Sequence, residues 1–124
     1  MKKKILIVED NVSLRDILKW SLEKDFAVLQ TGDGEEALSF CDKEKPSLIL
    51  MDVMLPKVDA GILCSKIRSF PKFGNPKIII MTGMSSKSND FKDRWKSMYQ
   101  VDDFFFKPFE MPVVIRRIKE LLDV

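Results

Sequence analysis

The sequence has no histidine and only two cysteines, Cys41 and Cys64, among its 124 residues. Protein zinc sites are built largely from imidazole and thiolate ligands, so the lack of histidine argues against a zinc site. The cysteines do not have the short spacing of a metal-binding pair, and we interpret them as buried free thiols of a reducing compartment. Carboxylates, hydroxyls and lysines are therefore the functional groups to consider.

Long apolar runs and a strong charge of one sign are lacking too. No stretch is long enough to cross a bilayer as a helix, and Lys2, Lys3 and Lys4 lead into strand-like sequence rather than an apolar signal core. The net charge is only +2, from 21 basic and 19 acidic residues, which gives no case for direct binding to nucleic acid or membranes. We expect one domain, residues 1–124, located in the cytoplasm.

Short apolar runs alternate with segments of helical periodicity. The runs predict strands at residues 3–8, 26–30, 48–52, 78–81 and 103–106. Helical spacing of apolar residues predicts helices at residues 12–24, 63–70, 85–99 and 111–122, and another through residues 37–41 that ends before Pro46. Successive strand–helix units predict an α/β fold, with helices on both faces of a doubly wound parallel sheet in three α/β/α layers.

Chemically useful residues stand at the ends of the predicted strands. Asp52 ends the buried run at residues 48–51, and three of the other strands are followed by Glu9 and Asp10, by Thr82 and by Lys107. Parallel strands bring their carboxyl ends to one edge, which is where α/β proteins bind ligands. We therefore expect three carboxylates, a hydroxyl and an ammonium to gather at this edge.

Such a cluster suits phosphoryl chemistry. Two like charges about 4 Å apart repel by roughly 4 kcal/mol at an effective dielectric near 20, so three clustered carboxylates would be strained or would hold extra protons, and a divalent cation between them removes this problem. Mg²⁺ takes oxygen ligands and is commonly shared between carboxylates and phosphate. Lys107 and Thr82 add a positive charge and a hydroxyl donor for phosphoryl oxygens, and aspartate is a covalent phosphoryl acceptor in other proteins.

Motifs at these strand ends, taken in order, resemble the receiver domain of two-component response regulators. The matching segments are Glu9-Asp10, Asp52, Met54-Leu55-Pro56 with Asp59 after it, Thr82-Gly83, Asp102-Asp103-Phe104 and Lys107-Pro108-Phe109. Each motif alone is weak, but together they cover essentially the whole chain at the spacing of the family. The resemblance implies the flavodoxin-like (βα)5 fold with strand order 2-1-3-4-5.

The resemblance implies a phosphorylation-dependent signalling switch. Asp52 would accept a phosphoryl group from a sensor histidine kinase or a phosphotransfer protein, and the domain's own site would catalyse phosphorylation and dephosphorylation. The implied site residues are Glu9, Asp10, Asp52 and the Met54 carbonyl for Mg²⁺, with Thr82 and Lys107 for the phosphoryl oxygens. The Lys107–Pro108 peptide bond is predicted to be cis, because a sharp turn there would direct Lys107 into the cluster.

The resemblance also implies how the signal leaves the domain. Thr82 would swing toward the phosphoryl group, and Phe104 would change rotamer by turning inward into the vacated space. The output face would be the fourth helix, the fifth strand and the fifth helix, acting on a downstream protein or a fused output domain. The domain would not be a metabolic enzyme.

The sequence leaves open both the length of the whole protein and its oligomeric state. The chain is either a stand-alone receiver or a piece of a longer protein. It is expected as a monomer or as a phosphorylation-dependent homodimer, in which Arg116 or Arg117 would meet Asp102 or Asp103 across a two-fold axis.

The sequence departs from the family pattern in three places. Ala60 stands where the family usually has glycine, with Gly61 displaced by one residue. Gln100 and Val101 replace a usual Gly-Ala, which removes a glycine stop after the fourth helix. Phe104 replaces the commoner tyrosine and lacks its hydroxyl. None of these changes touches the charged cluster.

Two other functions are considered beside the switch. A receiver-like interaction module could act without phosphorylation, but the intact acceptor, metal and lysine positions count against it. A flavin carrier of the same topology would need a phosphate-binding loop rich in serine, threonine and glycine after the first strand. The residues there are Glu9, Asp10 and Asn11, which would repel a phosphate in the absence of a metal ion.

Overall fold

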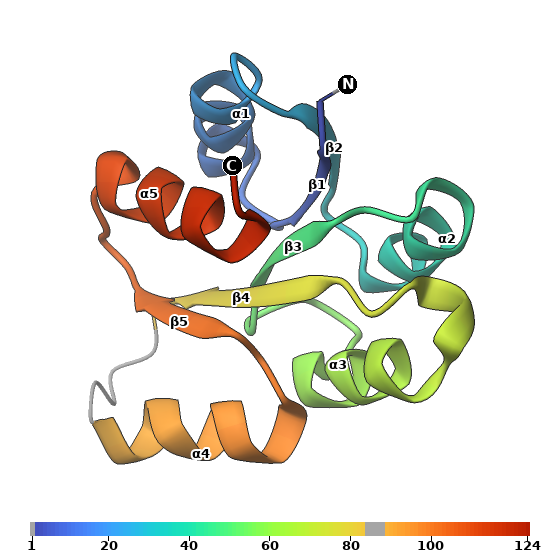
Figure 1. The fold of residues 1–124 in the computed structure, drawn as a ribbon. Helices are drawn as coiled ribbons and strands as arrows, with labels where there is room; N and C mark the ends of the chain where they lie inside the picture. The colour runs from blue at the N-terminus through green and yellow to red at the C-terminus, as the bar shows by residue number, and fades with distance from the viewer. Residues whose placement is uncertain (1, 84–88) are drawn as a thin grey trace.

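The computed structural model describes residues 2–83 and 89–124, which form three α/β/α layers (Figure 1). Within these residues, parallel strands form a five-stranded sheet in the order β2-β1-β3-β4-β5. The strands are β1 (Lys4–Val8), β2 (Ala27–Thr31), β3 (Leu48–Asp52), β4 (Lys77–Thr82) and β5 (Asp103–Phe106). The helices are α1 (Val12–Leu22), α2 (Gly34–Glu44), α3 (Ala60–Ser69), α4 (Asn89–Tyr99) and α5 (Met111–Leu122), with a 3₁₀ turn at Pro71–Phe73. The predicted doubly wound fold and its strand order are confirmed.

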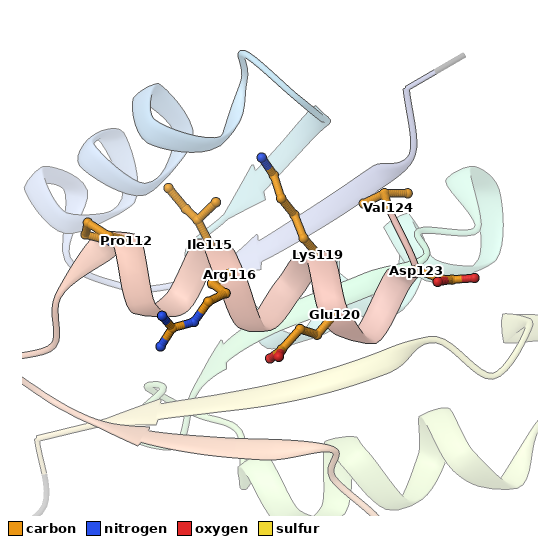
Figure 2. A pocket seen from close by; sticks show the side chains of 7 residues that line it. All are labelled: Pro112, Ile115, Arg116, Lys119, Glu120, Asp123 and Val124. Carbon is orange, nitrogen blue, oxygen red and sulfur yellow. The ribbon is translucent and has the colours of Figure 1, made fainter.

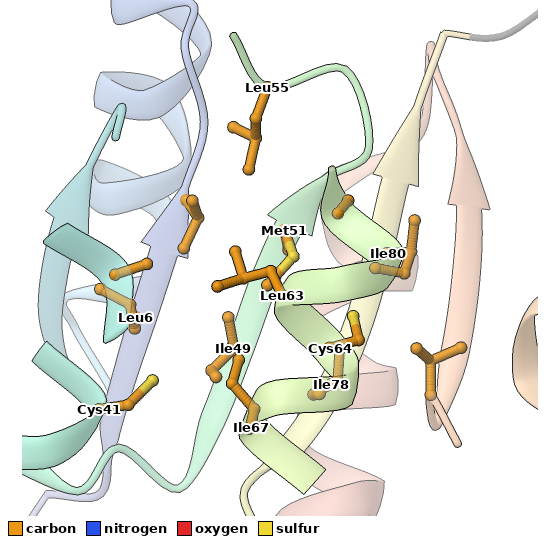
Figure 3. Packing of buried hydrophobic residues seen from close by; sticks show 14 of the residues in the cluster. Leu6, Cys41, Ile49, Met51, Leu55, Leu63, Cys64, Ile67, Ile78 and Ile80 are labelled. Carbon is orange, nitrogen blue, oxygen red and sulfur yellow. The ribbon is translucent and has the colours of Figure 1, made fainter. Parts of the chain in front are cut away.

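The sheet separates two apolar cores. α1 and α5 cover one face, whereas α2, α3 and α4 cover the other (Figure 1). All residues of the central strand β3 are buried: Leu48 and Leu50 join the first core, and Ile49 and Met51 join the second. Figure 3 shows Met51 and Ile49 directed toward Leu63 of α3. Burial on both faces explains why the run at residues 48–51 is apolar without alternation.

Side-chain caps begin three helices at the carboxyl edge of the sheet. The Oδ1 atoms of Asn11, Asp33 and Asp59 each accept a hydrogen bond from a backbone N–H in the first turn of α1, α2 and α3, at 2.9, 2.9 and 3.0 Å. Such caps satisfy N–H groups that have no partner within the helix. They also hold the loops after β1, β2 and β3 against the edge where the candidate site lies.

The observed bounds differ slightly from the predicted ones. The second strand runs from Ala27 to Thr31 instead of residues 26–30, because its pairing with β1 begins at Lys4↔Ala27 and ends at Val8↔Thr31. α4 is described from Asn89 onward, so the predicted start of that helix at residues 85–88 lies outside the described residues. In the described part of the chain, no helix has the length and apolarity needed to cross a membrane.

The two departures that involve glycine, at residues 60–61 and at Gln100, both lie where α3 meets α4. A Cβ atom on Gly61 would lie 2.7 Å from the Tyr99 ring, so the bare glycine leaves room for that ring to approach α3. Ala60 simply begins α3 after its Asp59 cap. Gln100 takes the left-handed conformation itself, with φ of 54°, and α4 ends at Tyr99 without a glycine.

Candidate functional site

Lys107 links two carboxylates across the sheet. Asp52 ends β3 and Glu9 follows β1, and the two side chains are almost completely buried. The Lys107 ammonium lies 2.7 Å from Asp52 Oδ2 and 2.7 Å from Glu9 Oε1. β1 and β3 are neighbours, whereas β5 lies two positions away from β3, so the length of the lysine side chain is what closes the gap. The parallel sheet thus brings these predicted site residues together.

Backbone N–H groups orient both carboxylates. The Met54 N–H donates to Asp52 Oδ1 at 2.9 Å, and the Asn11 N–H donates to Glu9 Oε2 at 3.0 Å. Each carboxylate therefore uses one oxygen for a backbone donor and the other for Lys107. Burial alone would lower the pKa of Lys107, but the hydrogen bonds and negative charges of Asp52 and Glu9 outweigh burial and raise it.

The remaining predicted site residues lie around this bridge. Asp10 is exposed, and its carboxylate forms no hydrogen bond or ion pair with the described part of the chain. Thr82 ends β4 and is fully buried, and its carbonyl accepts a hydrogen bond from the Lys107 N–H at 2.7 Å. The Met54 side chain is 65% exposed. The Lys107–Pro108 peptide bond is cis, which confirms the prediction.

The carboxylate oxygens at this edge are ligands of the kind that a hard divalent cation prefers, but they do not form a complete metal site. Such oxygens suit Mg²⁺, and Glu9 and Asp52 already converge on one positive charge. Within residues 2–83 and 89–124, however, no group of three or more Asp, Glu, Cys or His side chains could hold a metal ion as it stands. Glu9, Asp10 and Asp52 lie at the same edge of the sheet, as expected, but Lys107 stands between Glu9 and Asp52, and Asp10 is exposed.

Phe104 is already buried. Its ring has no solvent exposure and lies 5.2 Å from the Phe106 ring and 6.0 Å from the Trp95 ring of α4, measured between centroids. Without a hydroxyl, this side chain has no polar atom to keep hydrated, so complete burial leaves nothing unsatisfied. The sequence predicted that the Phe104 ring would turn inward, but a ring that is already buried cannot make this movement.

The comparisons with known proteins agree with this geometry. Residues 5–119 match the family described as the response regulator receiver domain. The chain belongs to this family. It is 38% identical over 123 residues to the alkaline phosphatase synthesis transcriptional regulatory protein PhoP of Bacillus subtilis, a match that covers 98% of this chain and 49% of PhoP.

Two further matches cover very different shares of the other protein. Histidine kinase P4 of Formosa agariphila is 34% identical over 122 residues, which is 98% of this chain but only 9% of that protein. The crystal structure of a CheY-like response regulator receiver domain protein from Methanospirillum hungatei has a TM-score of 0.85 and 29% identity, and the match covers 99% of this chain and 95% of that one. The chain therefore spans about half of PhoP and nearly the whole of the Methanospirillum receiver chain.

Sequence reasoning missed Arg15 and Gly32, which this receiver domain places beside the acidic pair. Arg15 Nη1 donates to the Glu9 carbonyl at 3.1 Å, and a Cβ on Gly32 would lie 2.6 Å from that nitrogen. One signal was present: Arg15 stands three and seven residues before Leu18 and Leu22, the buried residues of α1. A charged residue on the apolar stripe of a helix needs a partner, and the sequence alone does not name it.

A hollow of about 690 Å³ lies elsewhere on the receiver domain, along α5 (Figure 2). Its lining residues are Pro112, Ile115, Arg116, Lys119, Glu120, Asp123 and Val124. None of the residues around Asp52 contributes to it. We therefore assign the chemistry to the strand ends and not to this surface.

Proposed function

We propose that this receiver domain is a phosphorylation-dependent switch that accepts a phosphoryl group on Asp52 from a sensor histidine kinase or a phosphotransfer protein. The observation that supports it is the shared Lys107 ammonium, 2.7 Å from both Asp52 and Glu9. In the transfer, an Asp52 carboxylate oxygen bonds to phosphorus while the bond from phosphorus to the donor atom breaks, and the donor atom keeps the electron pair. The domain's own residues position and neutralise the group.

Lys107 and Thr82 are the proposed partners of the transferred group. A phosphoryl group adds roughly two negative charges and strong acceptor oxygens, so a nearby ammonium and hydroxyl stabilise it. Lys107 already contacts the Asp52 carboxylate, and Thr82 ends the strand next to β3. Both residues therefore lie at the edge of the sheet where the acceptor stands.

We propose Glu9, Asp10, Asp52 and the Met54 carbonyl as the ligands of Mg²⁺. When bound, the ion supplies positive charge that offsets the carboxylates and the incoming phosphoryl oxygens. Glu9 and Asp52 each give one carboxylate oxygen to Lys107 and the other to a backbone N–H, so a bound cation would have to share or displace these partners. Lys107 and Mg²⁺ therefore compete for these oxygens, and Asp10 is the carboxylate left free to complete the set.

We propose that the signal passes through the face formed by α4, β5 and α5. Thr82 and Phe104 lie on neighbouring strands, and the Phe104 ring contacts Trp95 of α4. The receiver would act in the cytoplasm as one domain, either on a downstream protein or on a fused output domain. In a dimer, Arg117 would have to exchange its present partner, since it already pairs with Asp103 of the same chain at 2.6 Å.

The test is intact-mass analysis after incubation with Mg²⁺ and acetyl phosphate. The wild type should gain one phosphoryl group, and Asp52→Asn should gain none, because an amide cannot form the acyl phosphate. Asp16→Asn, which changes an exposed carboxylate on α1, should be modified like the wild type. A chelator should abolish the reaction.

Modification of Asp52→Asn to the wild-type level would contradict the assignment of the acceptor. A wild type that stays unmodified by both acetyl phosphate and a phosphorylated histidine donor would favour the interaction module that acts without phosphorylation.

A further inference from the structure

The Glu9 side chain and backbone are held from four directions. Lys107 and the Asn11 N–H bind its two carboxylate oxygens, and its own N–H donates to the Thr31 carbonyl at 2.9 Å. The fourth contact is the hydrogen bond from Arg15 Nη1 to the Glu9 carbonyl at 3.1 Å. This carbonyl belongs to the peptide that joins Glu9 to Asp10, so Arg15 acts on the orientation of both acidic residues.

Gly32 makes room for the Arg15 guanidinium. A Cβ on Gly32 would lie 2.6 Å from Arg15 Nη1, closer than such contacts occur, but 3.4 Å from the Glu9 carbonyl oxygen and 3.7 Å from the Asp10 Cα. The side chain of Arg15 would therefore be displaced by an alanine there, whereas the acidic backbone would be in ordinary contact. Three segments meet at this point: the end of β1, the first turn of α1 and the loop after β2.

The placement of Arg15 is not explained by stability alone. In the described part of the chain its Nε is buried without a hydrogen-bond partner. A buried donor left unpaired costs free energy, typically about 1–3 kcal/mol. The hydrogen bond to Glu9 is thus maintained at an energetic cost beside the proposed metal ligands.

We propose that Arg15 is a positioning residue that orients the Glu9–Asp10 peptide and thereby sets the affinity of the site for divalent cations, with Gly32 providing its space. This inference rests on the proposed function, because it concerns the Mg²⁺ that assists modification of Asp52. Residues that orient metal ligands without touching the metal commonly change affinity by 10–100-fold when mutated. The positive charge of Arg15 works in the opposite sense, because it repels Mg²⁺. The test must therefore separate hydrogen bonding from charge.

Gly32→Ala makes this separation, because it displaces the guanidinium while retaining the charge. The dissociation constant for Mg²⁺ is measured from amide chemical shifts, without any phosphodonor. We expect Gly32→Ala to raise it about tenfold. Arg15→Lys, which keeps the charge but loses the reach and planar shape of the guanidinium, should raise it as well. Lys19→Gln, which removes an exposed charge from the same helix, should leave it within twofold of the wild type.

A double-mutant cycle tests the link between the two residues. In an Arg15→Gln background, Gly32→Ala has no guanidinium to displace and should change the dissociation constant by less than twofold. The Mg²⁺ concentration for half-maximal phosphorylation should rise in Gly32→Ala by the same factor as the dissociation constant. Urea unfolding in a chelator checks that each variant is folded.

Two outcomes would overturn the positioning role while leaving the proposed function intact. One is an unchanged Mg²⁺ affinity in both Gly32→Ala and Arg15→Lys, with the wild type still phosphorylated on Asp52. The other is an equal effect of Gly32→Ala with and without Arg15. A wild type that shows no Mg²⁺-dependent shifts at residues 9–11 and 52–54 would overturn both the positioning role and the proposed metal site.

Discussion

At the scale of single residues, the Lys107 bridge decides how two buried negative charges coexist. Glu9 and Asp52 are 1% and 5% exposed, and Lys107 supplies the counter-charge that both carboxylates share. A buried ion pair is often no better than an apolar replacement of the same shape, but removal of one partner leaves an uncompensated buried charge. Lys107 therefore stabilises the unphosphorylated domain, in addition to its proposed role toward the phosphoryl group.

Lys107→Met should destabilise the metal-free domain by about 3 kcal/mol, because Glu9 and Asp52 lose their common partner. Urea unfolding in the presence of a chelator measures this free energy. Mg²⁺ should then stabilise Lys107→Met more than it stabilises the wild type, since the ion no longer competes with an ammonium for the same oxygens. Lys19→Met, at an exposed position of α1, serves as the control. Equal stabilisation of wild type and Lys107→Met by Mg²⁺ would contradict the competition.

At the scale of elements, Arg68 of α3 fastens the end of α4 to the sheet. Its guanidinium donates to the Gln100 carbonyl at 3.1 and 2.8 Å and to Asp102 Oδ2 at 3.1 Å. Asp102 in turn accepts a hydrogen bond from the Ile78 N–H of β4 at 2.8 Å. These contacts hold Gln100 in its left-handed conformation, so the helix stop that glycine usually provides is supplied here by tertiary contacts.

Gln100→Gly should raise the free energy of unfolding by roughly 0.5–1 kcal/mol. A residue with a Cβ in the left-handed region costs about 1–2 kcal/mol, and the greater freedom of glycine in the unfolded chain takes back part of that gain. The exposed Gln100 side chain makes no contribution that glycine would lose, because Arg68 binds the backbone carbonyl. Thermal or urea unfolding measures the change. Gln100→Ala keeps the strain and should show no gain, and a gain of the same size in both variants would rule out backbone strain as the cause.

Asp103 joins three elements through its charge. Its carboxylate lies 2.6 Å from Arg117 Nε of α5 and 3.5 Å from Lys96 Nζ of α4. Burial alone would raise the pKa of Asp103, but hydrogen bonds from the Phe104 N–H and Arg117, together with the charge of Lys96, outweigh it and hold the pKa below the ordinary 3.8. A carboxylate with a lowered pKa stabilises the fold above its unfolded pKa and loses this contribution as the pH falls.

The stability difference between wild type and Asp103→Asn should therefore depend on pH. It should be full near neutral pH and shrink as the pH falls below about 4 toward the folded-state pKa, because Asp103 then becomes protonated in the folded domain. Urea midpoints measured across this range give the difference. Asp16→Asn, at an exposed carboxylate, supplies the reference. A difference that stays constant with pH would show that charge pairing at Asp103 does not stabilise the fold.

At the scale of the whole molecule, the proposed route of the signal lies in one of the two cores. The core under α2, α3 and α4 contains Phe104, with Trp95 packed against it, whereas α1 and α5 close the other face (Figure 1). In the proposed switch, a change at Asp52 would reach α4 through Thr82 on β4 and Phe104 on β5. The Phe104 ring is already packed in the core. A displacement of Thr82 must therefore move neighbouring side chains that are in contact.

Beryllofluoride with Mg²⁺ should shift amide resonances across β4, β5 and α5, and not only in the loop after Asp52. Trp20→Phe leaves Trp95 as the one tryptophan, and its fluorescence should change as well, because its ring contacts Phe104. Asp52→Asn should show neither change. Shifts confined to residues 53–59, with silent residues 103–117 and unchanged Trp95 emission, would show that the α4-β5-α5 face does not respond.

The sequence by itself determined the architecture and the identity of the residues at the functional edge. Apolar runs without alternation occur where strands are buried on both faces, as at residues 48–51, and apolar residues at helical spacing occur where helices cover the sheet. These signals are local, so they can be read from a few neighbouring positions. The parallel connection then brings the strand ends to one edge, which is why Glu9, Asp52 and Lys107 could be expected together.

Only the tertiary structure decided which of these groups contact one another. Lys107 and Glu9 are 98 residues apart in sequence, and their contact depends on the distance between β1 and β5 and on the length of the lysine side chain. The exposure of Asp10, the burial of Phe104 and the space that Gly32 leaves for Arg15 are likewise results of packing among distant segments. Local periodicity carries no information on such distances, because each is set by several elements at once.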